Sequence, residues 1–68
     1  MELVVKNIKK IMGEKGLKQK FVAEKSGFTE QQFSDLLSYR KRFDVDYVMP
    51  ICRALSVSPN DLFRLRKG

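Results

Sequence analysis

The chain has 68 residues, 43% of them hydrophobic and 32% charged, which is the composition of one small folded domain and not of a disordered segment. Its 14 Lys and Arg residues outnumber its 8 Asp and Glu residues, and the resulting formal charge of +6 suits a polyanionic partner. With no His and one Cys, the sequence excludes a zinc site, an internal disulfide and the nucleophile–base arrangements of hydrolytic enzymes.

The first predicted element is an amphipathic helix. Apolar residues recur at steps of three and four over residues 3–12, namely Val4, Ile8, Ile11 and Met12. Gly16 is a natural end for this helix, directly after Lys15, whose charge suits a helix C-terminus.

A pair of short helices joined by a tight turn follows. The first runs from about Lys18 to Lys25, and residues 26–28 form the turn, where Gly27 supplies a positive φ. Thr29 and Gln32 have the spacing of a capping box, which predicts a second helix from Glu30 to about Ser38. The residues predicted to be buried on this helix are Phe33, Leu36 and Leu37.

Residues 39–43 form a basic loop before the last two predicted helices. Asp44 and Asp46 compete as N-caps of a fourth helix, whose predicted buried residues are Val48, Ile51, Cys52 and Leu55. Because Pro50 lacks an N–H, this helix either begins late, with Pro50 in its first turn, or is kinked.

The segment Ser58-Pro59-Asn60-Asp61 is a strong helix start, and the last helix is predicted to carry Leu62, Phe63 and Leu65 to the end. The pattern as a whole predicts an all-α fold, a compact bundle of five short helices in one domain over residues 1–68. Its helix-turn-helix unit, between Gln19 and Ser38, comprises the second and third helices.

The sequence carries no signal for secretion or membrane insertion, since charge begins at Glu2 and no long apolar stretch follows. We therefore expect a cytoplasmic protein that is not an enzyme, binds no metal or other cofactor, and does not contact a membrane. Cys52 falls on the apolar face of its helix, so we expect a buried thiol.

Two separated segments resemble the phage-repressor/Cro (Xre-type) helix-turn-helix family. Residues 16–29 (GLKQKFVAEKSGFT) have the family's Gly-Leu pair, Gln, apolar–Ala pair and Gly at matching spacing, and residues 54–63 (ALSVSPNDLF) are similar to its typical ending. The resemblance covers about residues 6–63 and implies a lambda-repressor-like domain that binds specific double-stranded DNA. Such proteins are small bacterial or phage-encoded transcriptional regulators, mostly repressors, and commonly bind as homodimers.

The resemblance also assigns candidate DNA contacts. The positions that reach base edges from the recognition helix are Thr29, Glu30, Gln31 and Asp35, and Gln31 suits a bidentate contact to adenine. The positions that lie along the sugar–phosphate backbone are Lys18, Gln19, Lys20, Arg40, Lys41 and Arg42. The alternative for the second set is that Gln19 is an exposed polar residue at a helix start and that residues 40–42 form a solvated loop.

The chain departs from the family pattern at several positions. Lys18 replaces the usual Ser or Thr cap, and Tyr39 replaces the Gly that usually follows the recognition helix. Met12 and Leu37 stand where the family often has a partly buried Arg–Glu pair, and an apolar pair can be as stable there. Phe21 occupies a usually polar position, where it either covers the core, the reading we favour, or meets a partner.

The acidic residues of the predicted recognition helix leave a second function open. Glu30 and Asp35 are costly near phosphates unless they accept from cytosine, although Glu30 also suits the helix dipole. The alternative is a protein-interaction module on the same fold, antitoxin-like or a phage regulatory partner, with weak or no specific DNA binding. Charge-driven binding to any nucleic acid, including RNA, is a third. The candidate dimer surface is formed by Leu62, Phe63 and Leu65, the first two of which equally suit the core.

Overall fold

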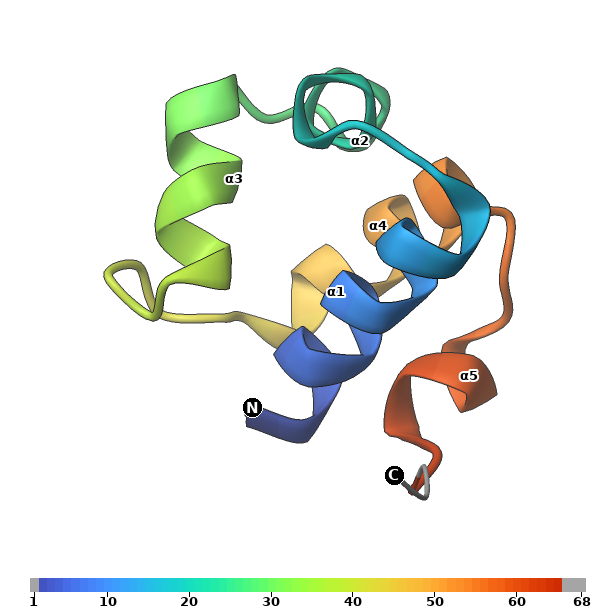
Figure 1. The fold of residues 1–68 in the computed structure, drawn as a ribbon. Helices are drawn as coiled ribbons and strands as arrows, with labels where there is room; N and C mark the ends of the chain where they lie inside the picture. The colour runs from blue at the N-terminus through green and yellow to red at the C-terminus, as the bar shows by residue number, and fades with distance from the viewer. Residues whose placement is uncertain (1, 66–68) are drawn as a thin grey trace.

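The computed structural model describes residues 2–65, and in this part of the chain every regular element is helical. The elements are α1 (Glu2–Lys15), α2 (Gln19–Ser26), α3 (Glu30–Leu37), the 3₁₀ turn η1 (Val45–Tyr47), α4 (Val48–Leu55) and α5 (Pro59–Phe63). Helix α1 packs against α3 and α5, while α2 packs against α3 and α4 (Figure 1). The predicted all-α bundle of five short helices is therefore confirmed. None of these helices is long and apolar enough to cross a membrane.

The core lies where the inward faces of all five α-helices meet. Its largest fully buried side chains include Phe33, Ile8, Leu36, Ile51, Leu55 and Leu62. Met12 and Leu37 are both buried as well, and they line one hollow between α1 and α3. Burial of both side chains is consistent with the expectation that an apolar pair is stable at these two positions.

Helices α1 and α4 each end at a residue in the left-handed conformation, and a lysine side chain connects the two ends. Gly16 ends α1 with φ 65°, and Ser56 ends α4 with φ 58°. The Lys15 Nζ donates to the carbonyl oxygen of Leu55 at 2.8 Å, which places a positive charge at the C-terminus of α4. The end of α1 is thereby tied to the end of α4.

Helix α4 begins later than either predicted aspartate cap would place it. The Asp44 carboxylate accepts from the Asp46 N–H at 2.9 Å and so caps η1, and α4 continues from η1 at Val48. Pro50 lies in the first turn of α4, where its missing N–H costs no intrahelical hydrogen bond. Of the two predicted arrangements, the late start is therefore correct.

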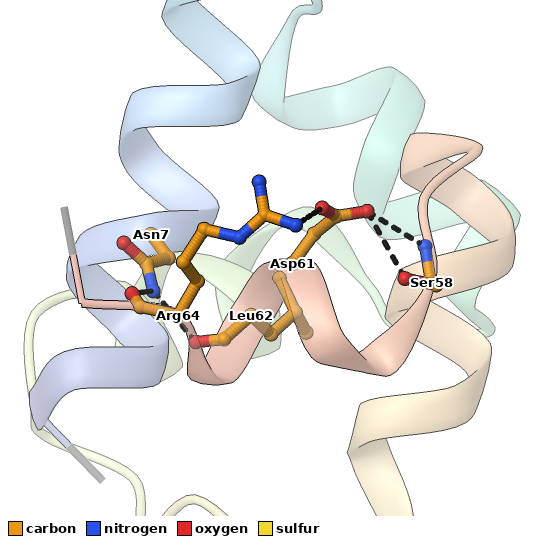
Figure 2. Close-up of polar contacts among 5 residues, drawn as sticks. All are labelled: Asn7, Ser58, Asp61, Leu62 and Arg64. Atoms are coloured by element: carbon orange, nitrogen blue, oxygen red, sulfur yellow. Dashed lines mark hydrogen bonds and ion pairs between the residues drawn. The ribbon is translucent and has the colours of Figure 1, made fainter.

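Helix α5 is shorter than predicted, and a buried amide on α1 accounts for its end. It begins at Pro59, with the Asp61 carboxylate accepting from the Ser58 N–H at 3.0 Å, but it ends at Phe63. The Asn7 Nδ2 donates to the carbonyl oxygens of Leu62 and Arg64 at 2.7 and 2.8 Å (Figure 2). These two bonds hold the backbone at Arg64 in an extended conformation, which ends the helix. The prediction that Leu65 belongs to α5 was therefore wrong.

The structure decides between the alternatives left open for two apolar residues, and for Phe21 it contradicts the favoured one. Phe21 is 44% exposed and stands outside the core, with the Lys25 Nζ 5.7 Å from its ring centroid. Val22 and Ala23 fill the inward face of α2, which leaves the neighbouring Phe21 on the outer face. Leu62 is fully buried, so it belongs to the core and not to a dimer surface.

Candidate nucleic-acid interface

The helix-turn-helix unit owes its sharp angle to the turn between α2 and α3. Gly27 has φ 83°, and its N–H donates to the carbonyl oxygens of Ala23 and Glu24. The Phe28 N–H also donates to the Ala23 carbonyl oxygen, at 2.9 Å. This left-handed C-cap ends α2 and redirects the chain within three residues, which sets α3 across α2 (Figure 1).

The start of α3 is fixed by the predicted capping box. The Thr29 Oγ1 accepts from the Gln32 N–H at 3.1 Å, while the Gln32 Oε1 accepts from the Thr29 N–H at 3.0 Å. The Gln32 side chain is thereby committed to the cap. Thr29 caps as well, and its hydroxyl hydrogen is the part of it left for a ligand.

The outer face of α3 carries the other predicted base-contacting residues. Glu30 and Gln31 are exposed and Asp35 is half-buried, whereas Phe33 points into the core. The Gln31 Nε2 donates to the Asp35 Oδ1 at 2.9 Å. This bond orients the Gln31 amide and leaves its Oε1 and its second N–H for a base edge.

The predicted phosphate contacts at the start of α2 lie beside this face. Gln19 lines one hollow together with Glu30, Gln31 and Ser34, so the structure brings the first residue of α2 next to the start of α3. Lys18 and Lys20 flank it and are exposed. Lys18 makes no side-chain cap, as its residue type predicted, so the first N–H groups of α2 keep their partial positive charge.

The basic loop is tied to the other end of α3. The N–H groups of Arg40 and Lys41 both donate to the carbonyl oxygen of Asp35, at 2.9 and 3.1 Å. Arg40 and Arg42 are exposed, whereas Lys41 is half-buried with its Nζ 5.8 Å from the ring centroid of Tyr47. Two of the three predicted cations of this loop are thus open to solvent, and the third lies against an aromatic ring.

Ser34 is a polar residue of this surface that the sequence interpretation missed. It lines the hollows on both sides of Gln19, the one containing Gln31 and another containing Ser38. Its position four residues after Glu30 and four before Ser38 was the available signal, because residues at that spacing share one helix face.

The residues that the structure describes contain no group of three or more His, Cys, Asp or Glu that could hold a metal ion. Cys52 is buried in the core, and burial, aided by the Asp61 carboxylate, raises the pKa of its thiol. The thiol is therefore protonated at neutral pH, the form that is the poorer nucleophile.

Comparison with known proteins gives one finding. Residues 7–68 match the family model of the Cro/C1-type helix-turn-helix DNA-binding domain. Neither the curated proteins nor the solved structures contain a significant match. The match includes the helix-turn-helix unit and both helices that follow it.

Proposed function

Because this chain belongs to the Cro/C1-type helix-turn-helix DNA-binding family, we propose that it is a transcriptional repressor that recognises a specific double-stranded DNA sequence as a homodimer. The observation that carries the proposal is the outer face of α3, where Gln31 and Asp35 are hydrogen-bonded to each other at 2.9 Å. Exposed cations lie at both ends of this face, at the start of α2 and in the loop after α3. A base-reading centre between two backbone-binding flanks is what a helix in the major groove requires.

The acidic side chains of α3 are compatible with this role. Asp35 accepts from Gln31, so part of its hydrogen-bonding capacity is already satisfied. Its second oxygen and the Glu30 carboxylate can only accept hydrogen bonds, and in the major groove the exocyclic amino groups of cytosine and adenine donate. We therefore propose that α3 reads an adenine through Gln31 and a cytosine through a carboxylate, while guanine and thymine at the second position are rejected because they present only acceptors to it.

The size of the molecule suits two copies side by side on DNA. Its extents are 30 × 23 × 19 Å, and half-sites one helical turn apart are centred about 34–36 Å from each other. Phe63 is 47% exposed and Leu65 is 85% exposed, so these two residues remain our candidates for the dimer contact. A dimer seated in two successive major grooves keeps other proteins off the same DNA, which is the simplest route to repression. The bacterial cytoplasm or nucleoid, where DNA is found, is the proposed location.

The test is selection from randomised duplex DNA at near-physiological salt, with the wild type and two variants. We expect a palindromic motif for the wild type and loss of preference at one base pair per half-site for Gln31→Ala. Arg42→Ala should weaken binding to all sequences about equally and keep the motif. Retention without a motif would mean charge-driven binding, and no retention would refute DNA recognition.

Exposed Phe21 favours a second candidate function. An aromatic ring that is 44% exposed beside Lys25 suits a protein partner, as in a regulator whose DNA binding is controlled by another protein. If DNA selection fails, Phe21→Ser should abolish capture of such a partner while leaving the fold intact, because the ring lies outside the core.

A further inference from the structure

We propose that Lys9, on α1, is an additional DNA-backbone contact, and that the ring of Tyr39 holds its ammonium group at the phosphate. The inference rests on the proposed function, because it names a partner group on the same DNA. Lys9 belongs to neither the recognition helix nor the two basic flanks, and it lies on the exposed side of α1.

The first observation is the hollow that Lys9 borders. It lies where α1, α2 and α3 meet and is lined by Lys9, Met12, Gln19, Ser34, Leu37 and Ser38. Met12 and Leu37, both buried, form its apolar floor, while Lys9 and the neutral polar side chains form its rim. No carboxylate is among these described lining residues. The rim therefore offers three groups that can donate hydrogen bonds to a phosphate oxygen: the Lys9 ammonium, the Gln19 amide and the Ser34 hydroxyl. The Ser38 hydroxyl instead donates to the carbonyl oxygen of Asp35 at 3.4 Å.

The second observation is the direction in which this hollow continues. Gln19 and Ser34 also line the neighbouring hollow, whose other residues are Glu30 and Gln31 on the base-reading face. The two hollows share these residues and are therefore adjacent on the surface between the outer face of α3 and Lys9. A DNA strand at the border of a major groove filled by α3 follows this surface, which brings a phosphate to Lys9.

The third observation is the contact between Lys9 and Tyr39. The Lys9 Nζ lies 5.4 Å from the ring centroid of Tyr39, within the range of a cation–π interaction. Tyr39 has φ 66°, a strained backbone conformation for a residue other than glycine. Its side chain is 55% exposed, so burial in the core does not account for its position. A glycine would relieve the strain, and the tyrosine ring instead restricts a long, flexible lysine to the rim of the hollow.

The experiment measures the affinity for the selected duplex as a function of salt, for the wild type, Lys9→Ala and Lys10→Ala. If the selection yields no motif, a random duplex is used. Lys10 is the matched control, since it carries the same charge but lies about 100° further round α1. Loss of one phosphate contact should reduce the slope of log K against log salt by about 0.9, which corresponds to about fivefold weaker binding at 0.15 M salt. Lys10→Ala should leave the slope unchanged.

Variants of Tyr39 test the positioning role. Tyr39→Phe keeps the ring and should keep the wild-type affinity, whereas Tyr39→Leu should weaken binding. Adding Tyr39→Leu to Lys9→Ala should produce no further loss, because the two residues act on one contact. Thermal melts check that each variant is folded.

The outcomes separate the inference from the proposed function. A wild-type slope for Lys9→Ala, in a protein that still binds its motif, overturns the inference and leaves the proposed function standing. A wild type that binds no DNA overturns both. Equal losses for Lys9→Ala and Lys10→Ala also overturn it, since they would report net charge and not a located contact.

Discussion

Replacement of the buried Asn7 should cost more stability than that of any other polar side chain in the described structure. Asn7 is 2% exposed and donates to the carbonyl oxygens of Leu62 and Arg64 at 2.7 and 2.8 Å. Loss of the bond to Leu62 leaves a buried carbonyl without a partner and costs roughly 1–3 kcal/mol, and loss of the part-buried bond to Arg64 costs about 1 kcal/mol. We therefore expect Asn7→Ala to lower the free energy of unfolding by about 2–4 kcal/mol, a large share of the ~5–15 kcal/mol that a typical domain has.

The assay is urea unfolding followed by far-UV circular dichroism, together with a thermal melt. The midpoint should fall while the denaturant slope stays constant, because the surface exposed on unfolding is nearly the same. For a chain of this size the loss corresponds to a decrease in Tm of roughly 10–30 °C. Asn60→Ala is the control: Asn60 is exposed, so its replacement should change the free energy of unfolding by less than about 0.5 kcal/mol.

A second variant separates the hydrogen bonds from packing. Asn7→Asp keeps the shape of the side chain but turns a carboxylate oxygen toward two carbonyl oxygens, so it should be less stable than Asn7→Ala at pH 7. The reasoning would be refuted if Asn7→Ala behaved like Asn60→Ala, or if Asn7→Asp were as stable as the wild type.

Three further predictions concern single residues. Ser56→Gly should raise the free energy of unfolding by about 0.5–1 kcal/mol, since Ser56 has φ 58°; a lower urea midpoint would contradict the assigned strain. Thr29→Ala should cost about 1 kcal/mol through loss of the cap on Gln32, measured by the same urea series, with Thr29→Ser nearly unchanged as its control. Burial raises the pKa of the Cys52 thiol, so the folded protein keeps a proton that the unfolded chain loses near pH 8.5. The contribution of the thiol to the free energy of unfolding is therefore lost as the pH rises above that value. The stability advantage of the wild type over Cys52→Ala should therefore shrink between pH 7 and pH 10, and a constant difference would exclude the effect.

The sequence predicts those parts of the fold that depend on nearby residues. Thr29 and Gln32 are three positions apart, so their capping box could be predicted from the sequence, and it located the start of α3. Gly27 likewise marked the turn because a positive φ favours glycine. The order and approximate ends of the helices follow from such local signals, and so does the outer face of α3 on which the predicted base-contacting residues lie.

Features that depend on distant residues could not be predicted in this way. Asn7 lies within an apolar stripe, and its partners are 55 and 57 residues away, so nothing local indicated that it would end α5. The exposure of Phe21 could not be predicted either, because a helix of eight residues has too few turns for its apolar spacing to define one inward face. The contact of Lys9 with Tyr39 depends on how α1 and α3 cross, which the sequence pattern does not give.

The double use of Asp35 has a consequence for the thermodynamics of association. Its side chain orients Gln31, and its carbonyl oxygen accepts from the N–H groups of Arg40 and Lys41, so one residue holds both the amide proposed to read a base and the basic loop. If the proposed complex forms, the Gln31 amide and the backbone of residues 40–41 need little further ordering, because these hydrogen bonds already hold them in the unbound protein. Association then loses little conformational entropy, since immobilising a free side chain costs about 0.5–1.5 kcal/mol. The proposed base and backbone contacts would also keep a fixed mutual distance, so a shift by one base pair would disrupt both sets together.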